Sequence, residues 1–231
     1  MNWEPTIKPT ELAEQRLIQA ILDDHFPINS TLPPERDLAG LIGVTRPTLR
    51  ESMQRLAKDG WIEIRHGKPT RVRDFWKEGN ITVLSSIAKY QSNNDHDFIV
   101  HLLQIRLLLS PTYAQMAIAN QPSLIADFLK QAPTPDNSNS TYSIFDLQLH
   151  QTLAIHSGNP VFILILNGFR DLFAQKAQFY FSFSETRHHS SIFYRDLQKA
   201  ATNNDSEAAK QITKKVMQDS IDFWSFFLPN K

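Results

Sequence analysis

The sequence predicts a mainly α-helical protein with a small N-terminal part that carries a β-hairpin and a larger part made of helices. Two short helical patterns meet at Gly43, and an alternating segment at 61–65 follows them. Beyond residue 80 no strand pattern recurs, and apolar residues repeat at helical spacing over long segments. With 231 residues, 41% of them hydrophobic, the chain is long enough for two domains with buried cores.

The first expected helix runs from about Lys8 to Asp24, where apolar residues recur at helical spacing. Phe26-Pro27 ends it, because proline disfavours helical geometry in the residue before it. A second helix is expected after Pro34, and its inward-facing residues are predicted to be Leu38, Leu41 and Ile42.

Gly43 supplies a turn before a third helix, for which Thr45 is the expected N-cap. Pro47 fits its first turn, because the earliest backbone N–H groups of a helix have no acceptor within it. Gly60 ends this helix, and its buried face is expected to comprise Leu49, Met53 and Leu56. These patterns predict a helix-turn-helix over about residues 35–54.

A β-hairpin is expected to follow, with the loop HGKPT joining a strand at 61–65 to a second strand at 71–73. Three helices and this wing predict a winged helix-turn-helix domain over residues 1–76, with a connector at 77–80. Residues 81–231 are expected to form an all-helical effector-binding bundle that encloses a cavity. Its main expected helices are Phe98–Ala119, Tyr142–His156, Val161–Phe183, Ser191–Thr202 and Ser206–Phe227.

Charge is concentrated in one region, although the formal net charge of the chain is zero. From Thr45 to Arg73 there are eight basic side chains and three acidic ones. A concentrated basic surface on a neutral protein is what contact with DNA phosphates requires. We therefore expect the winged domain to bind DNA.

Several other features limit the class of protein. The chain has no cysteine, which excludes disulfides and thiolate metal sites. Its N-terminus shows no signal-peptide pattern, and the longest apolar run, 161–166, is far shorter than a membrane span. A cytoplasmic bacterial protein, associated with the nucleoid through DNA and not with a membrane, is expected.

The DNA-contacting residues are expected at the start of the third helix and in the wing. A recognition helix reads base edges from its first turns, and an arginine there can bond two acceptors of guanine. Gly67 allows a compact loop that suits a minor groove. Singly, each candidate could be a surface side chain without a contact, but the joint spacing favours DNA binding by Arg36, Thr45, Arg46, Thr48, Arg50, His66, Gly67 and Lys68.

The segments FPINSTLPPERDLAGLIGVTRPTLRESMQRLAKDGWI and HGKPT resemble the GntR family of bacterial regulators, and within it the FadR subfamily. The similarity is strong over about residues 8–76, and SGNPVFILILNG at 157–168 is the clearest later signature. The resemblance implies a homodimer that binds palindromic operator DNA and is released by long-chain acyl-CoA. It implies repression of fatty-acid degradation genes and activation of unsaturated fatty-acid synthesis genes, with no catalytic residue and no cofactor besides the effector.

Position by position, the resemblance implies the DNA contacts above, except Lys68, which the wing pattern alone suggests. The effector contacts that it implies are Arg106, Phe173, Tyr180, Met217, Ser220 and Trp224, with Asp219 beside them. Pro47 stands where the subfamily has threonine, and Phe173 where it has tyrosine. Met217 replaces a glycine close to the ligand, so its side chain is expected to fill or line part of the cavity.

Alternative functions start from Asp146 and His150, which lie one helical turn apart on one face. Many GntR relatives use this pair with two further histidines to hold a metal that binds a carboxylate effector. Tyr194 and Val216 fall at those further positions, so a remnant pair without a metal is expected. The alternatives are a GntR regulator that senses a metal-bound organic acid and an acyl-CoA carrier without DNA function. The chain has no nucleophile elbow, P-loop or dinucleotide fingerprint, and we do not expect an enzyme.

Overall fold

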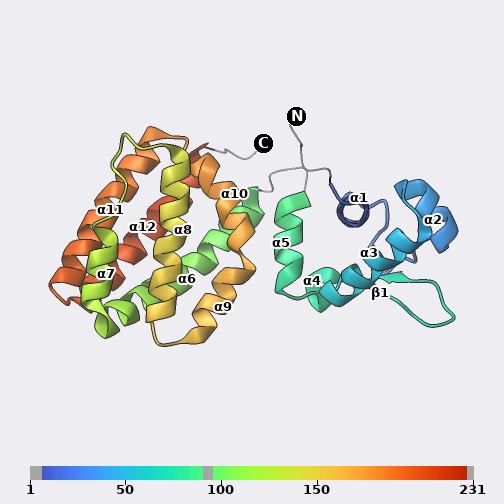
Figure 1. The fold of residues 1–231 in the computed structure, drawn as a ribbon, viewed down its shortest axis with the longest axis horizontal. Coiled ribbons are helices and arrows are strands. Elements are labelled where there is room, and N and C mark those ends of the chain that lie inside the picture. Colours follow the sequence, from blue (N-terminus) through green and yellow to red (C-terminus); the bar gives the residue numbers. More distant parts are fainter. Residues whose placement is uncertain (1–6, 91–95, 228–231) are drawn as a thin grey trace. The chain divides into compact units, whose positions relative to one another are not determined.

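The computed structural model describes residues 7–90 and 96–227. The chain divides into two compact units, Met1–Asn93 and Asn94–Lys231, which we call unit 1 and unit 2. Unit 1 combines helices with a small sheet, and unit 2 is helical (Figure 1). The expected mainly α-helical fold is confirmed.

Unit 1 begins with three helices, α1 (Pro9–Leu22), α2 (Glu35–Ile42) and α3 (Arg46–Asp59). α3 packs against α1 and α2. Their inward faces form a core in which large apolar side chains are completely or almost completely buried, among them Leu17, Leu38, Leu49, Leu56 and Trp61. The helix-turn-helix is thus held from behind by α1.

The wing contains two short antiparallel strands, β1 (Ile62–Glu63) and β2 (Arg71–Val72). Ile62 lies opposite Val72, and the backbone of residues 29–32 runs along the free edge of β2 through Asn29 N to Val72 O (2.9 Å) and Leu32 N to Thr70 O (2.8 Å). The strands are shorter than the expected 61–65 and 71–73, because residues after Glu63 leave the ladder to form the loop.

The prediction that Leu41 of α2 lies in the core is wrong. Leu41 is 70% exposed, whereas Leu38 and Ile42 are buried. On an eight-residue helix the buried stripe is narrow, and Ala39 completes it beside Leu38 and Ile42. Leu41 lies at the edge of that stripe and projects outward.

Two further helices follow the wing, α4 (Phe75–Glu78) and α5 (Ile81–Tyr90). The sequence places a connector at 77–80 and the second domain from 81, whereas in the structure α5 packs against α1. Val83 and Ile87 are buried on α5. The compact N-terminal unit therefore extends past the residue at which the sequence pattern ends it.

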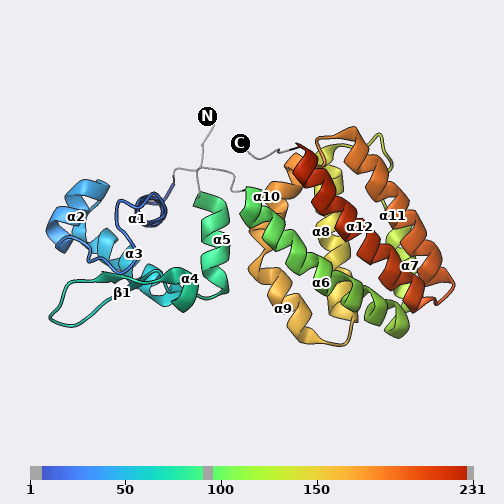
Figure 2. The same ribbon diagram turned by 180° about the vertical axis from the view of Figure 1, so that it is seen from behind.

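Unit 2 is a helical bundle, and Figures 1 and 2 show its two faces. α6 packs along α12 on one side and against α8 on the other, while α11 packs against α12 and α7. α10 and α9 pack against α8. The helices are α6 (His96–Asn120), α7 (Pro122–Leu129), α8 (Asn139–His156), α9 (Pro160–Gly168), α10 (Arg170–Tyr180), α11 (Ser184–Thr202) and α12 (Ser206–Phe227).

The segment 161–183 forms two helices where the sequence predicts one. α9 ends at Gly168, and Phe169, with φ −107° and ψ 2°, leaves helical geometry before α10 begins. Glycine is a poor helix former and allows this break. α11 begins at Ser184, seven residues before the expected Ser191. Among the helices of the described residues, none has the length and apolar character needed to cross a bilayer.

Candidate functional site

The first turn of α3 is held by a local cap. Gly43 adopts a left-handed conformation (φ 76°), which ends α2 and turns the chain toward Thr45. The Thr45 side chain accepts a hydrogen bond from the Thr48 backbone N–H (3.4 Å), and the two hydroxyls lie 2.8 Å apart. The expected N-cap is confirmed, and it fixes the direction in which the following side chains leave the helix.

The arginines around this turn are exposed. Arg50 Nε donates to Glu35 Oε2 at 2.6 Å, which joins α3 to the start of α2. Arg36 pairs with its neighbour Asp37 at 3.1 Å. The bond to Glu35 uses only the Nε of Arg50. The two terminal nitrogens of Arg50 have the fork geometry that binds guanine.

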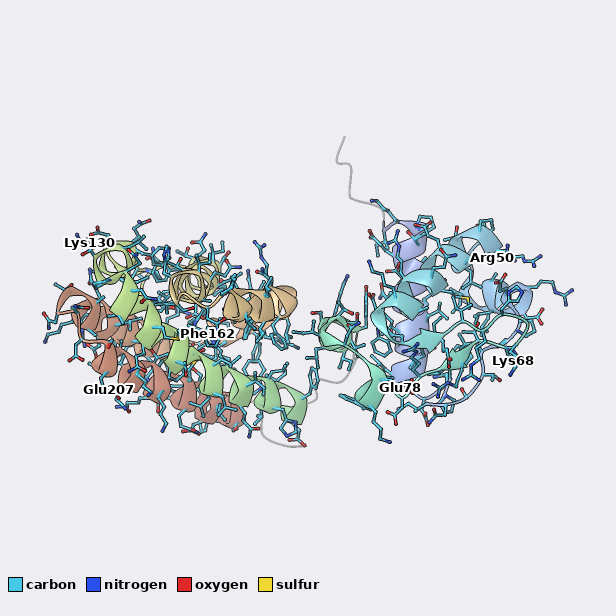
Figure 3. All side chains as sticks on the ribbon, turned by 90° about the horizontal axis from the view of Figure 1, so that it is seen from below. Arg50, Lys68, Glu78, Lys130, Phe162 and Glu207 are labelled. Carbon is cyan, nitrogen blue, oxygen red and sulfur yellow. The ribbon has the colours of Figure 1, made fainter. Side chains whose placement is uncertain are left out.

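The wing loop carries the remaining DNA candidates, His66, Gly67 and Lys68, and all three are exposed. Gly67 is left-handed (φ 69°), and open space surrounds the position of a Cβ. Figure 3 shows Lys68 and Arg50 toward the same end of unit 1. The predicted DNA-contacting residues of α3 and the wing thus lie in one unit, and all are exposed except Thr48, which is half-buried.

Arg71 has a structural role that the sequence did not indicate. Its guanidinium contacts Glu63 (3.0 Å), Asn29 (2.6 Å) and Glu78 (3.1 Å), and so ties together the two strands, the segment before α2 and the helix α4. Hydrogen bonds from Arg65 and Arg71 lower the pKa of Glu63 to about 2. Two of the eight basic residues counted above therefore hold the wing in shape.

Unit 2 contains a mostly apolar cavity that is partly open to solvent. We call it the effector cavity, after the residues expected to contact an effector. All six predicted effector residues line it, from α6 (Arg106), α10 (Phe173 and Tyr180) and α12 (Met217, Ser220 and Trp224). Sequence reasoning missed further lining residues, which include Ile99, Leu102, Leu103, Leu172, Lys176, Ser190 and Phe193. Their apolar members share the helical periodicity of ordinary core residues, so the pattern alone cannot separate them.

A buried ion pair lies at the inner wall of the effector cavity. Arg106 Nη2 donates to Asp146 Oδ2 (2.7 Å), and Tyr194 donates to Asp146 Oδ1 (3.1 Å). Burial acts to raise the pKa of Asp146, but the charge of Arg106 and smaller contributions, which include hydrogen bonds from Arg106 and Tyr194, together outweigh it and leave that pKa lowered. The Arg106 guanidinium also lies 5.2 Å from the centre of the Phe173 ring.

His150 lies beside this pair and belongs to a second polar chain. Its Nδ1 is 2.7 Å from the Tyr113 hydroxyl, which is 2.7 Å from Ser110 Oγ. Its Nε2 is 3.9 Å from Asp146 Oδ1, too far for a hydrogen bond. Burial, followed by the charge of Arg106, lowers the pKa of His150 to about 3, so the ring is neutral at physiological pH.

The Asp146 and His150 pair was expected to be a remnant without a metal. Within residues 7–90 and 96–227 no group of three or more histidine or acidic side chains is arranged to hold an ion. One oxygen of Asp146 is bound to the cation Arg106. The other oxygen accepts from Tyr194, so both carboxylate oxygens have partners within the protein.

The outer part of the effector cavity holds partly satisfied polar groups. Tyr180 donates to Ser220 (3.3 Å), and Ser220 donates to the Val216 carbonyl (2.8 Å). Burial raises the pKa of Tyr180 to about 12, so it remains a neutral donor. Trp224 Nε1 is buried without a hydrogen-bond partner in the described part of the chain, and Met217 is 3% exposed.

Comparison with known proteins matches both parts of the chain. The family model of bacterial regulatory proteins of the gntR family matches residues 9–72, and that of the FadR C-terminal domain matches residues 73–229. The fatty acid metabolism regulator proteins of Shewanella pealeana and Shewanella denitrificans are each 42% identical to this chain over 193 residues, which is 84% of this chain and 81% of theirs.

A solved structure of Lar, described as controlling expression of the Listeria monocytogenes agr system, has the same fold. It covers 98% of this chain and 100% of its own, with a TM-score of 0.64 at 15% identity. The two family models together cover nearly the whole chain. The chain therefore belongs to the GntR family of bacterial regulatory proteins and carries the FadR C-terminal domain, which makes it a DNA-binding transcription regulator and not an enzyme.

Proposed function

We propose that this protein regulates the transcription of fatty-acid metabolism genes and that long-chain acyl-CoA releases it from operator DNA. The relatives from Shewanella that match most of the chain are named as fatty acid metabolism regulators. The observation that carries the proposal is the effector cavity, which six residues chosen from the sequence line together. We propose repression of degradation genes and activation of unsaturated fatty-acid synthesis genes.

Residues 1–76 are proposed to carry the DNA contacts, 77–80 to act as the connector and 81–231 to form the effector-responsive part. Within that last range, α5 packs on α1 and so belongs structurally to unit 1. The first turns of α3 would enter the major groove, with Arg46, Thr48 and Arg50 at the base edges. Thr45 and Arg36 would contact phosphate, and the wing residues His66, Gly67 and Lys68 would enter the adjacent minor groove. A homodimer would match a palindromic operator, because each half-site takes one recognition helix.

The acyl chain is proposed to lie in the effector cavity, where its burial removes apolar surface from water. Ser220, Trp224 and Tyr180 offer polar groups for the amide and thioester part of the ligand. Binding can change DNA affinity only if the ligand prefers one of two conformations of the protein. Because an acyl chain needs more room than the packed helices leave, α10 and α12 are the elements that it would displace.

The test is fluorescence anisotropy of a labelled FadR-type palindrome at fixed salt, with and without oleoyl-CoA. Tight binding that oleoyl-CoA relieves would support both halves of the proposal. Tight binding that oleoyl-CoA does not change would support the operator claim and reject long-chain acyl-CoA as the effector. Weak binding equal to that of a scrambled duplex would reject the operator claim.

Met217 is proposed to limit the length of the acyl chain. Its buried side chain lines the effector cavity at a position where the FadR subfamily has glycine. Met217→Gly should increase the affinity for oleoyl-CoA relative to decanoyl-CoA, because it enlarges the cavity. Met217→Leu, which nearly conserves volume, is the control and should keep the wild-type ratio.

A further inference from the structure

A smaller cavity adjoins the effector cavity on its α8 side. Four of its lining residues also line the effector cavity: Arg106, Asp146, Phe173 and Ala177. The two cavities are therefore neighbours that share part of their walls. The remaining lining residues are Ser143, Leu147, His150, Gln151 and Leu166.

His150 gives this smaller cavity a polar atom that is not satisfied. The His150 side chain is 5% exposed, and its Nε2 has no hydrogen-bond partner among the described residues. Two neighbouring polar groups are already used, since Tyr113 bonds the other ring nitrogen and Asp146 accepts from Arg106 and Tyr194. A buried polar atom without a partner is costly, so a ligand that supplies one gains affinity.

The charges around the smaller cavity select the kind of group that fits. Arg106 and Asp146 neutralise each other at 2.7 Å. A carboxylate would bring a second buried anion next to Asp146, and an ammonium group or metal ion would meet the charge of Arg106. A neutral hydroxyl avoids both costs. It can donate or accept, and it therefore fits either tautomer of the neutral His150 ring.

We propose that the effector is an acyl-CoA whose chain carries a hydroxyl group far from the thioester. The chain would extend from the effector cavity past Phe173 and Ala177 into the smaller cavity, where its hydroxyl bonds His150 Nε2. This inference rests on the proposed function and specifies the chemical class of its ligand.

The test compares two matched pairs of ligands on the full-length protein by isothermal titration calorimetry. The pairs are 12-hydroxystearoyl-CoA with stearoyl-CoA and 16-hydroxypalmitoyl-CoA with palmitoyl-CoA. At least one hydroxylated ligand should bind about tenfold more tightly than its plain counterpart, the usual value of satisfying a buried polar group. His150→Phe should abolish this preference and still bind the plain ligands.

His156→Phe is the matched control, because His156 lies on the same helix but does not line either cavity. It should keep the preference for the hydroxylated ligand. If His150→Phe does not fold, the ring nitrogen resonances of wild-type His150 provide a second measurement. The Nε2 resonance should shift with the preferred hydroxylated ligand and not with its plain counterpart.

Four results would overturn the inference. Equal affinities within both pairs would mean that the protein does not recognise the hydroxyl group. A preference that survives in His150→Phe would mean that His150 is not the partner of that hydroxyl. If plain stearoyl-CoA and palmitoyl-CoA bind and release operator DNA while the hydroxylated ligands bind no better, only this inference fails. If none of the four ligands binds, the proposed effector fails and the inference fails with it.

Discussion

Arg50 is the side chain on which operator recognition should depend most. Arg50→Ala is expected to weaken operator binding by about 1–3 kcal/mol, the usual contribution of an arginine that bonds two acceptors of guanine. Lys58→Ala, late in the same helix, should cost far less and act equally on all sequences. Anisotropy at fixed salt measures both, and full operator binding by the Arg50 variant would contradict the assignment.

Glu35 is expected to hold the Arg50 guanidinium in its reading orientation through the 2.6 Å bond between α2 and α3. Glu35→Gln removes a negative charge near the DNA and loosens Arg50. Affinity for random DNA should rise, and the ratio of operator to random affinity should fall by up to about fivefold, since an exposed pair contributes ~1 kcal/mol or less.

Glu51→Gln is the matched control for Glu35, because Glu51 also pairs with an arginine of α3, Arg55 at 2.6 Å. Its ratio of operator to random affinity should remain that of the wild type. If Glu51→Gln lowers the ratio of operator to random affinity as much as Glu35→Gln does, then charge alone, and not the position of Arg50, determines the preference for the operator.

At this scale the sequence predicted what depends on neighbours in the chain and missed what depends on distant contacts. The cap at Thr45 follows from residue types within a few positions. The role of Arg71 depends on Asn29, 42 residues away, and on Glu78 in another element. Nothing in the charge pattern separates Arg71 from an arginine that faces DNA.

Among the elements, boundaries with a local signal were predicted well. Gly43 and Gly60 are left-handed (φ 76° and 97°) and end α2 and α3 as expected. The break between α9 and α10 has a weaker signal, because apolar residues continue on both sides of Gly168. Packing of the two helices on α8 decides where that segment turns, and packing is not visible in the periodicity.

Gly79 should be essential to the junction between α4 and α5. A Cβ there would lie 2.4 Å from the Phe75 carbonyl oxygen and 2.9 Å from Val83 Cγ2. Gly79→Ala is expected to lower the free energy of unfolding by about 1–3 kcal/mol, because backbone or a buried side chain must move. Urea unfolding measures the change.

Gly40→Ala is the comparison within the same unit, since nothing lies within 4 Å of a Cβ at Gly40. Gly40 is inside α2, where alanine should stabilise the helix by about 0.5–1 kcal/mol. If both variants change stability in the same direction, steric contact at Gly79 is not the cause.

For the whole molecule, protonation of His150 should make unit 2 sensitive to acid. Its pKa is about 3 in the folded protein, against an ordinary value of 6.5. Below pH 6.5 His150 binds a proton in the unfolded chain but not in the folded protein. The contribution of neutral His150 to the free energy of unfolding is therefore fully present above pH 6.5 and is lost as the pH falls toward 3. One such group contributes a slope of about 1.4 kcal/mol per pH unit.

Urea unfolding at pH 7, 6 and 5, followed by helical circular dichroism, measures this slope. His150→Phe should lose less stability than the wild type between pH 6 and pH 5, by nearly the slope of one proton. Other histidines act equally on both proteins. Identical pH dependence of the two would mean that His150 titrates normally.

The candidate site as a whole was predicted unevenly. The six effector residues came from the resemblance to a family, and the structure places them around one cavity. The unsatisfied Nε2 of His150 had no sequence signal, because it depends on which partners Tyr113, Arg106 and Tyr194 choose in three dimensions. A residue type can be recognised from the sequence, whereas an unused hydrogen-bonding atom requires coordinates.

The packing of α5 against α1 has a practical consequence for how the protein can be divided. A fragment that stops at residue 76 would uncover the face of α1 that α5 covers, and it should aggregate or melt at lower temperature. A fragment that continues to Tyr90 keeps Val83 and Ile87 with their apolar neighbours. Limited proteolysis should therefore spare the junction at Gly79, and the longer fragment is the one to express for crystals with operator DNA.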